Sequence, residues 1–245
     1  MTIVGCAGSF PGPDSAASCY LIDTGSYRLV VDLGNGALGA LQHYCELTDI
    51  DAICLSHLHA DHCLDMCGYS VFQNYHPEGP RRPVPVYGPA GTEERLSRAL
   101  GGDHPGMAEA FEFHALSVGT FEIGPLRLAT AHMNHPVETF GFRIEHGGKV
   151  LAYSADTGPS DELVSLAANA DVLLCEASFL EGPDLPPDLH LTARQAAEHA
   201  TRADVGQLVL THLVAWNDPS RSLAEAAAAF GGSLSLASPG KQLPG

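Results

Sequence analysis

Short apolar or alternating stretches recur along the whole chain, and glycine, proline or aspartate bounds most of them. This pattern is typical of β-strands, and we expect strands at residues 2–6, 18–23, 27–32, 52–55, 84–87, 121–123, 126–131, 139–145, 150–154, 172–175 and 208–210. Apolar residues spaced three and four apart predict helices at residues 37–45, 62–75, 92–100, 161–168, 192–202 and 220–230. Because strand-rich and helix-bearing regions alternate, the sequence predicts an α/β fold in which helices cover the faces of sheets.

The same pattern favours a single domain. With 245 residues and 45% apolar content the chain can bury an ordinary core, and we expect one domain over residues 1–237. Residues 77–85 and 181–188 are rich in proline, glycine and charge, which predicts surface loops rather than linkers. Residues 238–245 carry no pattern, and we expect a disordered tail there.

The charge of the chain limits its partners. A formal net charge of −17 opposes a strong, non-specific hold on nucleic-acid phosphates or anionic lipid. A small anionic substrate is still allowed, because metal ions can supply positive charge locally. No apolar run approaches the roughly 20 residues that span a membrane, so we expect no membrane partner.

The cysteines and the first residues bear on location. The cysteine count of 7 is odd and no CxxC pair occurs, which favours reduced thiols in the cytoplasm over a secreted disulfide framework. The start MTIVGCAGS contains a lipobox-like IVGC but has neither the charged leader nor the apolar segment of a signal peptide. We therefore interpret it as a first strand.

A glycine-rich turn follows the predicted strand at 27–32. Gly34, Gly36 and Gly39 spell the GxGxxG of dinucleotide-binding turns. Such a turn also needs an acidic residue about 20 positions further on to hold the ribose hydroxyls. Ser56 and His57 occupy that place. We therefore interpret the glycines as a plain strand-to-helix turn.

Four ligand-type side chains lie within six positions of the stretch LSHLHADH. His57 and His59 are two residues apart at the end of a predicted strand, so both imidazoles project to one side and can reach one metal ion. Asp61 and His62 follow where the chain turns into a helix and can face a second ion. We predict metal binding by this stretch.

One such stretch cannot complete two coordination shells, so further ligands must come from elsewhere. Three other predicted strands end in a histidine or aspartate, a common location for catalytic residues on α/β scaffolds. The candidates are His132 or His135, Asp156 and His212.

The ordered set HxHxDH at 57–62, a later His135, SADTG around Asp156 and THL at His212 resembles the metallo-β-lactamase superfamily of dinuclear metal hydrolases over nearly the whole chain. The resemblance implies a four-layer αβ/βα sandwich with two divalent ions at one edge. Zinc is expected, and Mn²⁺ or Fe²⁺ suits the same ligands. The implied ligands are His57, His59 and His135 for one ion, Asp61, His62 and His212 for the other, and Asp156 as the bridge.

The resemblance also bears on two further residues. The spacing from His135 to Gly141 is similar to that in the tRNA-processing nuclease branch, which favours His135 over His132. Asp32 matches a buried acid that such proteins place beneath the histidine loop, where it orients a ligand. Ser56 and Cys63 flank ligands without a separate base, and we interpret both as packing residues.

Two downstream elements resemble the phosphodiesterase branches. LCEASF around Glu176 is similar to their HEATF element, and HLT at His190 is similar to their H-S/M-T element. The resemblance implies that His190 stabilises the transition state or donates a proton at the scissile phosphate, and that Glu176 helps to position it. The alternative is that His190 is a loop residue ahead of a helix that Thr192 caps.

Longer stretches, among them GCAGSFPGPDSAASCYLI, SHLHADHCLDMCGY and PPDLHLTARQA, resemble an actinobacterial group of atypical class II cyclic nucleotide phosphodiesterases. This implies hydrolysis of 3′,5′-cyclic AMP or GMP to the 5′-monophosphate through a metal-bridging hydroxide, with Asp61 among the catalytic residues. Two ions suit this reaction because they activate water and neutralise charge on the phosphate. It also implies a homodimer. Residues 9–14 and 73–76 are our candidates for the pocket rim.

Three alternatives stay open. A tRNA 3′-processing endonuclease needs a basic, glycine-rich arm that the sequence lacks, and the net charge opposes it. A lactonase, thioesterase or lactamase would use the same ligands. A metal-loaded scaffold protein without catalysis is the third alternative.

Overall fold

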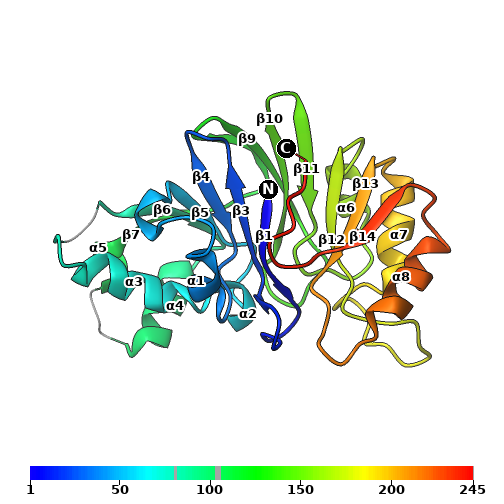
Figure 1. Cartoon of the computed structure of the whole chain (residues 1–245), viewed down its shortest axis with the longest axis horizontal. Coiled ribbons are helices and arrows are strands. Elements are labelled where there is room, and N and C mark those ends of the chain that lie inside the picture. Colours follow the sequence, from blue (N-terminus) through cyan, green and yellow to red (C-terminus); the bar gives the residue numbers. More distant parts are fainter. Residues whose placement is uncertain (80–81, 103–105, 245) are drawn as a thin grey trace.

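The computed structural model describes residues 1–79, 82–102 and 106–244. Within these residues two seven-stranded sheets face each other, and helices cover the outer face of each (Figure 1). The first sheet runs β2-β1-β3-β4-β5-β6-β7, with β1 (Thr2–Ala7), β2 (Ala16–Ala17), β3 (Cys19–Asp23), β4 (Arg28–Val31), β5 (Ala52–Cys54), β6 (Val84–Gly88) and β7 (Phe111–Ala115). The second runs β14-β13-β12-β11-β10-β9-β8, with β8 (Gly119–Ile123), β9 (Leu126–His132), β10 (Phe140–His146), β11 (Lys149–Tyr153), β12 (Val172–Glu176), β13 (Gln207–Thr211) and β14 (Ser233–Leu236).

The helices complete the four layers. On the first sheet lie α1 (Ala37–Leu41), α2 (Ala60–Cys63), α3 (Met66–Tyr75), α4 (Thr92–Leu100) and α5 (Gly106–Ala110), with a 3₁₀ turn at Leu47–Asp49. On the second sheet lie α6 (Asp161–Leu166), α7 (Ala193–Arg202) and α8 (Pro219–Ala227). This arrangement confirms the predicted αβ/βα sandwich.

Apolar side chains fill the spaces between all four layers. Along β4, Leu29 and Val31 pack between the two sheets, whereas Val30 packs against the helices of the first sheet. Along β12, Leu174 faces the central layer and Leu173 faces α6 and α7. Successive side chains of a strand point to opposite faces, so a strand covered on both faces becomes a continuous apolar run. This explains why these strands could be predicted from short apolar runs.

All of the predicted strands and helices are present, with shifted ends. The predicted helix at 62–75 is two helices, α2 and α3, and β2, β7, β14 and α5 were not predicted. These missed elements are short: β2 has two residues, and β14 is a four-residue edge strand in which serine and leucine alternate. In elements this short, the pattern of apolar and polar residues repeats too few times to predict a strand or a helix.

The expected disordered tail is corrected by the structure for residues 238–244. Gly240 N donates to Ile3 O at 2.8 Å, Ile3 N donates to Lys241 O at 2.9 Å, and Leu243 is buried in the central core. The short β2 covers only the later part of β1, so the first residues of β1 present a free edge, which the tail pairs. The tail is therefore ordered by its pairing with the edge of β1, and not by a pattern of apolar and polar residues in its own sequence.

The direction of the strands brings polar residues to one edge of the sandwich. Strands β4 and β5 are parallel, as are β11, β12 and β13, so the carboxyl ends of each set meet at the same edge of its sheet. The segments that follow β5, β11 and β13 contain the predicted ligands other than His135, which follows β9. Among the described residues, no helix has the length and apolar character needed to cross a bilayer.

Candidate metal centre

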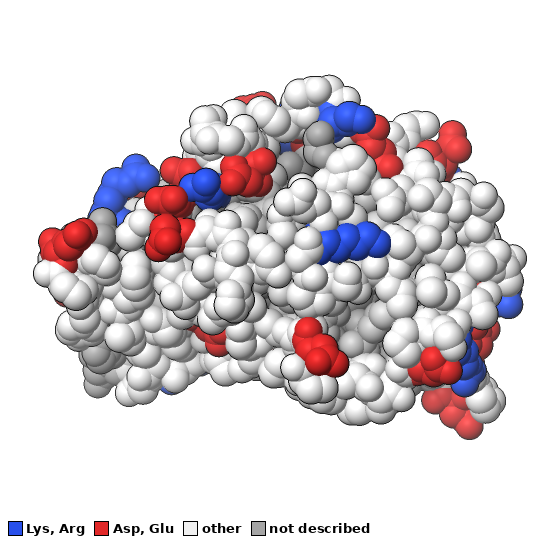
Figure 2. All heavy atoms as spheres, in the orientation of Figure 1, with Lys and Arg blue, Asp and Glu red and all other residues white. Residues whose placement is uncertain are grey.

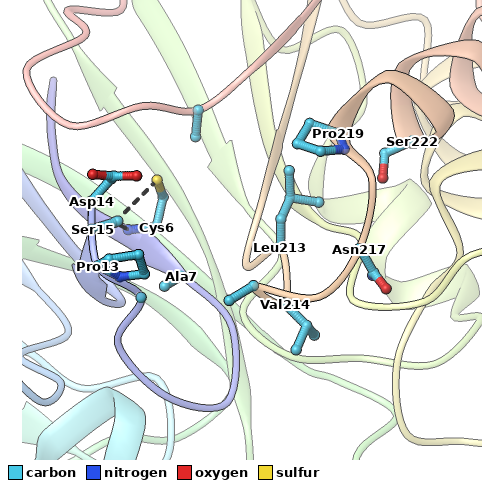
Figure 3. Close-up of a pocket in the computed structure, with 13 residues that line it drawn as sticks. Cys6, Ala7, Pro13, Asp14, Ser15, Leu213, Val214, Asn217, Pro219 and Ser222 are labelled. Carbon is cyan, nitrogen blue, oxygen red and sulfur yellow. Dashed lines mark hydrogen bonds between the residues drawn. The ribbon is translucent and has the colours of Figure 1, made fainter.

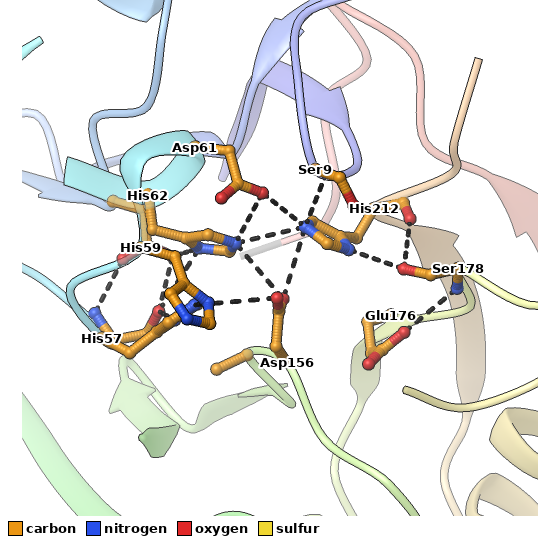
Figure 4. A network of polar contacts seen from close by, with 12 residues as sticks. Ser9, His57, His59, Asp61, His62, Asp156, Glu176, Ser178 and His212 are labelled. Carbon is orange, nitrogen blue, oxygen red and sulfur yellow. Dashed lines mark hydrogen bonds and ion pairs between the residues drawn. The ribbon is translucent and has the colours of Figure 1, made fainter. Parts of the chain in front are cut away.

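The predicted ligands lie together, although they come from distant parts of the chain. Figure 4 labels all of them except His135. The ligands form two groups that share one residue, and within each group all ligand atoms lie within 4.8 Å of one another. The first group is His57, His59, His135 and Asp156; the second is Asp61, His62, Asp156 and His212. His132 is not in either group: it is exposed, and its ring lies tilted against Phe140 with centroids 4.7 Å apart.

The first group surrounds one point with nitrogen atoms. His59 Nδ1 lies 3.1 Å from His57 Nε2 and 3.3 Å from His135 Nε2. Asp156 Oδ2 lies 3.7 Å from His57 Nε2. Two ligands on a tetrahedral zinc, with bonds of about 2.0–2.1 Å, are about 3.3–3.4 Å apart. The spacing of these atoms therefore suits a single small cation. Strand β5 ends at Cys54, so His57 and His59 converge from the loop after the strand.

The second group has the same spacing. His212 Nε2 lies 3.2 Å from His62 Nε2 and 3.0 Å from Asp61 Oδ2. Asp156 Oδ1 lies 3.2 Å from His62 Nε2 and 3.4 Å from His212 Nε2. Asp156 therefore contributes one oxygen to each group, which is the arrangement that a bridging carboxylate needs.

Asp32 and Ser56 orient two of the histidines. Asp32 Oδ2 accepts from His62 Nδ1 at 2.8 Å and from the hydroxyls of Ser56 and Tyr153 at 2.9 Å each. Since Ser56 Oγ donates to Asp32, it accepts from His57 Nδ1 at 3.1 Å. Both Nδ1 atoms therefore carry the proton, and both Nε2 lone pairs point into the groups. Our interpretation of Ser56 as a packing residue is wrong, whereas Cys63 does pack in the apolar layer under the helices.

The other two Nε2 ligands are held in the same way. His135 Nδ1 donates to Leu189 O at 2.9 Å. Ser178 Oγ donates to His212 O at 3.0 Å, so it accepts from His212 Nδ1 at 2.7 Å. Sequence analysis missed Ser178 and Leu189, and neither a serine nor a main-chain carbonyl carries a recognisable signal. Four histidines thus have their tautomer fixed for metal binding before any ion arrives.

The donor set fits two cations by a further criterion. Asp156 is buried, and its Oδ1 has no hydrogen-bond partner within the described residues. A buried carboxylate oxygen without a partner is costly, and such atoms are commonly satisfied by an ion. Imidazole and carboxylate ligands suit zinc, manganese and iron alike.

The charge state of the first group also suits metal binding. Burial lowers the pKa of His57, His59 and His135, which keeps these imidazoles neutral as a ligand must be. Burial raises the pKa of Asp156, but His212 and His62 outweigh it and hold this pKa well below its ordinary value. The aspartate is therefore a carboxylate at neutral pH.

Strained backbone marks three of the strand ends. Asp32, Ala155 and His212 have positive φ angles of 58°, 51° and 55°. Residues other than glycine enter this left-handed region at a cost of about 1–2 kcal/mol, and such strain concentrates at functional sites. The conformation turns each chain sharply from its strand into the site.

The glycine-rich turn after β4 supports the histidine loop. A Cβ atom on Gly34 would lie 1.9 Å from Asp61 O, so only glycine allows this approach. Leu33 N donates to His62 O at 2.8 Å. Gly36, with φ of 79°, precedes α1. The turn therefore has a structural role in holding the loop, as the interpretation of a plain strand-to-helix turn implied.

Glu176 and His190 form a pair beside both groups. Glu176 is fully buried, and its Oε1 accepts from His190 Nδ1 at 2.8 Å and from Thr157 N at 2.9 Å. The His190 ring lies 5.6 Å from the His135 ring and 5.5 Å from the His212 ring. Burial lowers the pKa of His190, but Glu176 outweighs it and raises this pKa above its ordinary value.

The alternative role for this segment is present as well. Thr192 caps α7 by accepting from Gln195 N, and the Gln195 side chain accepts from Thr192 N in return. The capping box fixes the start of α7, and its N-cap residue Thr192 lies two positions after His190. Capping and the Glu176 contact therefore coexist, and the cap helps to hold His190 in place.

A cavity of about 270 Å³ lies close to the site without containing it (Figure 3). It opens between the loop after β1 and the loop after β13, and Leu213 is one of its lining residues. Leu213 lines this cavity, whereas the side chain of its neighbour His212 belongs to the second ligand group. None of the clustered histidines or aspartates lines it.

We expect Asp32→Asn to lower the affinity for metal by about 10–100-fold, because an amide cannot accept from His62, Ser56 and Tyr153 as the carboxylate does. Competition with a chromophoric chelator measures this change. Asp49→Asn is the control, since Asp49 is exposed, contacts Arg28 and Thr48, and belongs to neither ligand group. Equal affinities for both variants would contradict the orienting role of Asp32.

The comparisons with known proteins agree with this geometry. A sequence model described as "Beta-lactamase superfamily domain" matches residues 21–213. An uncharacterized protein of Mycobacterium tuberculosis is 42% identical over 238 residues, which cover 95% of this chain and 87% of that protein. The probable metallo-hydrolase YhfI of Bacillus subtilis is 29% identical over 243 residues, 98% of this chain and 97% of that one, and its crystal structure superposes with a TM-score of 0.87.

A ribonuclease Z of Mycobacterium bovis is 30% identical over 241 residues, covering 87% of this chain and 85% of that enzyme. The family match spans most of the chain, and the histidine and aspartate cluster is compatible with a dinuclear metal site. The chain therefore belongs to the β-lactamase superfamily and is a metal-dependent hydrolase of the metallo-β-lactamase fold.

Proposed function

We propose that the chain is a dinuclear phosphodiesterase that hydrolyses 3′,5′-cyclic nucleotides, cAMP or cGMP, to 5′-monophosphates. The observation that carries the proposal is the Glu176–His190 pair, which stands beside ligand groups that share Asp156. A lactam or lactone does not require a separate histidine held by a buried carboxylate. A phosphodiester with a poor alkoxide leaving group gains from one, because the departing oxygen must take up a proton.

The clustered residues and His190 have different roles in the proposed reaction: the cluster would hold the cations, and His190 donates a proton. Two cations held by the seven clustered side chains would lower the pKa of water and neutralise charge on the phosphate oxygens. Asp156 and Asp61 would supply negative charge to hold the cations, and the Nε2 lone pairs of four histidines already point into the ligand groups. Glu176 accepts from His190 Nδ1, so the proton on His190 Nε2 is the one available for transfer. It goes to the 3′-oxygen as the P–O3′ bond breaks and water oxygen bonds to phosphorus.

The charge distribution favours a small substrate over a polynucleotide. Binding of RNA requires basic residues that are free to contact successive phosphates. On the face shown in Figure 2 the basic side chains lie scattered, and several are beside acidic ones. Many of the described arginines are committed to acidic partners at 2.5–2.9 Å: Arg28, Arg98, Arg127, Arg143, Arg202 and Arg221. The similarity to ribonuclease Z makes precursor tRNA the competing substrate to test.

A cytoplasmic location and a homodimer belong to the same proposal. All of the cysteines are free thiols, and Cys19, Cys54 and Cys175 are fully buried. Cyclic nucleotides are cytoplasmic signals, so a reducing compartment suits both the thiols and the substrate.

The test combines metal analysis with turnover of four substrates: cAMP, cGMP, bis(4-nitrophenyl) phosphate and precursor tRNA. We expect two ions per chain and a kcat/KM for a cyclic nucleotide at least about 10-fold above that for the aryl diester. Cleavage of precursor tRNA at the higher efficiency would replace the proposal with a nuclease. Hydrolysis of thioesters, lactones or lactams alone would place the chain among the other hydrolases of the superfamily.

A further inference from the structure

Two exposed aromatic side chains stand together near the metal centre. Trp216 exposes 74% of its surface and Phe10 exposes 39%. Their ring centroids are 5.3 Å apart, and the planes meet at 38°. Large aromatic side chains contribute most when buried, so an exposed pair indicates a surface that binds something. Trp216 is also the only tryptophan of the chain.

The loop after β1 places Phe10 beside the second ligand group. Ser9 N lies 3.4 Å from His212 Nε2, and Phe10 is the next residue. A Cβ atom on Gly8 would lie 2.4 Å from His212 O, so the main chain at Gly8 runs in direct contact with His212. Leu213 O accepts from Gly8 N at 3.1 Å, which joins this loop to the one that carries Trp216. Phe10 therefore lies at the border of the metal centre.

The loop after β13 holds Trp216 through a residue that also orients a ligand. Asn217 Nδ2 donates to Ser178 O at 2.7 Å. Ser178 Oγ accepts from His212 Nδ1 at 2.7 Å. One serine thus fixes both the His212 ring and the segment next to Trp216. The position of the indole relative to the ligand groups is set by these contacts.

We propose that Trp216 and Phe10 form the base-binding site of the enzyme, in which the purine of a cyclic nucleotide stacks on the indole while its phosphate lies at the metal centre. This rests on the proposed function. Base stacking on aromatic side chains accepts every base, because every base has a π-face. A site of this kind accepts adenine and guanine with similar KM values, and it binds the smaller pyrimidines more weakly. The net charge of −17 disfavours an anionic membrane as the occupant of the pair.

A fluorescence titration tests the site directly, because Trp216 is the only tryptophan. The metal-loaded full chain is titrated with AMP and, separately, with ribose 5-phosphate, which has the phosphate but no base. We expect AMP to quench the fluorescence in a saturable way and ribose 5-phosphate to leave it nearly unchanged. Equal responses to the two compounds would overturn the base site, since the signal would then report phosphate binding.

Substitution gives an independent test. We expect Trp216→Ala to raise the KM for cAMP about 10-fold or more while kcat changes less than about threefold, and Trp216→Phe to recover most of the loss. Tyr44→Ala is the matched control, since Tyr44 is an aromatic residue 36% exposed on the segment after α1 and should leave both constants unchanged. An unchanged KM in Trp216→Ala overturns the inference and leaves the proposed function standing. Quenching by AMP in an enzyme that turns over no cyclic nucleotide supports the base site and removes the proposed reaction.

Discussion

The Asp156→Ala variant is expected to lose both cations and to turn over substrate at least about 10³-fold more slowly than the natural chain. Asp156 is the residue common to both ligand groups, with Oδ1 beside His62 and His212 and Oδ2 beside His57. Removing it takes one ligand from each ion and leaves the positive charge less well neutralised. In the proposed phosphodiesterase the cations would supply most of the stabilisation of the phosphate, so the rate is expected to fall with them. Metal content per chain, measured with kcat/KM on the same sample, checks both effects.

The Asp61→Ala variant gives an internal comparison. Asp61 belongs to the second group alone, so we expect this variant to keep one ion and lose the other together with most activity. Asp184→Ala is the control, because Asp184 is exposed on the loop before α7 and belongs to neither group. If Asp156→Ala retained two ions and full turnover, the shared-carboxylate arrangement would not be the catalytic centre. If the chain were instead a scaffold protein without catalysis, Asp156→Ala would lose the metal but still bind its partner protein.

The ligand set was predictable because chain geometry and chemistry constrain it together. His57, His59, Asp61 and His62 are close in sequence, so their proximity needs no knowledge of the fold. Asp156 and His212 come from other strands, but each follows an apolar strand whose carboxyl end had to lie at the same sheet edge. The choice of His135 over His132 came from the resemblance, because both residues lie at or just after the end of the same strand.

The groups that orient the ligands could not be predicted. Ser178 meets His212 across 34 residues, and Leu189 meets His135 across 54 through a main-chain oxygen that any residue would offer. Tyr153 reaches Asp32 across 121 residues, between the two sheets. Such contacts depend on how the layers stack. The tail is a similar case, because its order comes from the free edge of β1.

We expect His190→Gln to lower kcat for a cyclic nucleotide by about 10²–10³-fold while barely affecting bis(4-nitrophenyl) phosphate. A general acid contributes about 10²–10⁴-fold where the leaving oxygen needs a proton. The 3′-alkoxide of a nucleotide needs one, whereas a nitrophenolate leaves without it. Steady-state rates on the two substrates make this comparison, and His43→Gln is the control because His43 is exposed on the segment after α1.

The pH profile separates proton donation from simple packing. Glu176 raises the pKa of His190 against the effect of burial, so the protonated imidazole persists above its ordinary titration range. Activity should therefore fall on the alkaline side as pH rises through this raised pKa. In Glu176→Gln the neutral amide no longer favours the cation, the pKa of His190 falls, and the alkaline limb moves to lower pH. If the alkaline limb stays in place in Glu176→Gln, His190 is not the titrating acid. If His190→Gln lowers the rate equally for the cyclic nucleotide and for bis(4-nitrophenyl) phosphate, His190 has a positioning role alone.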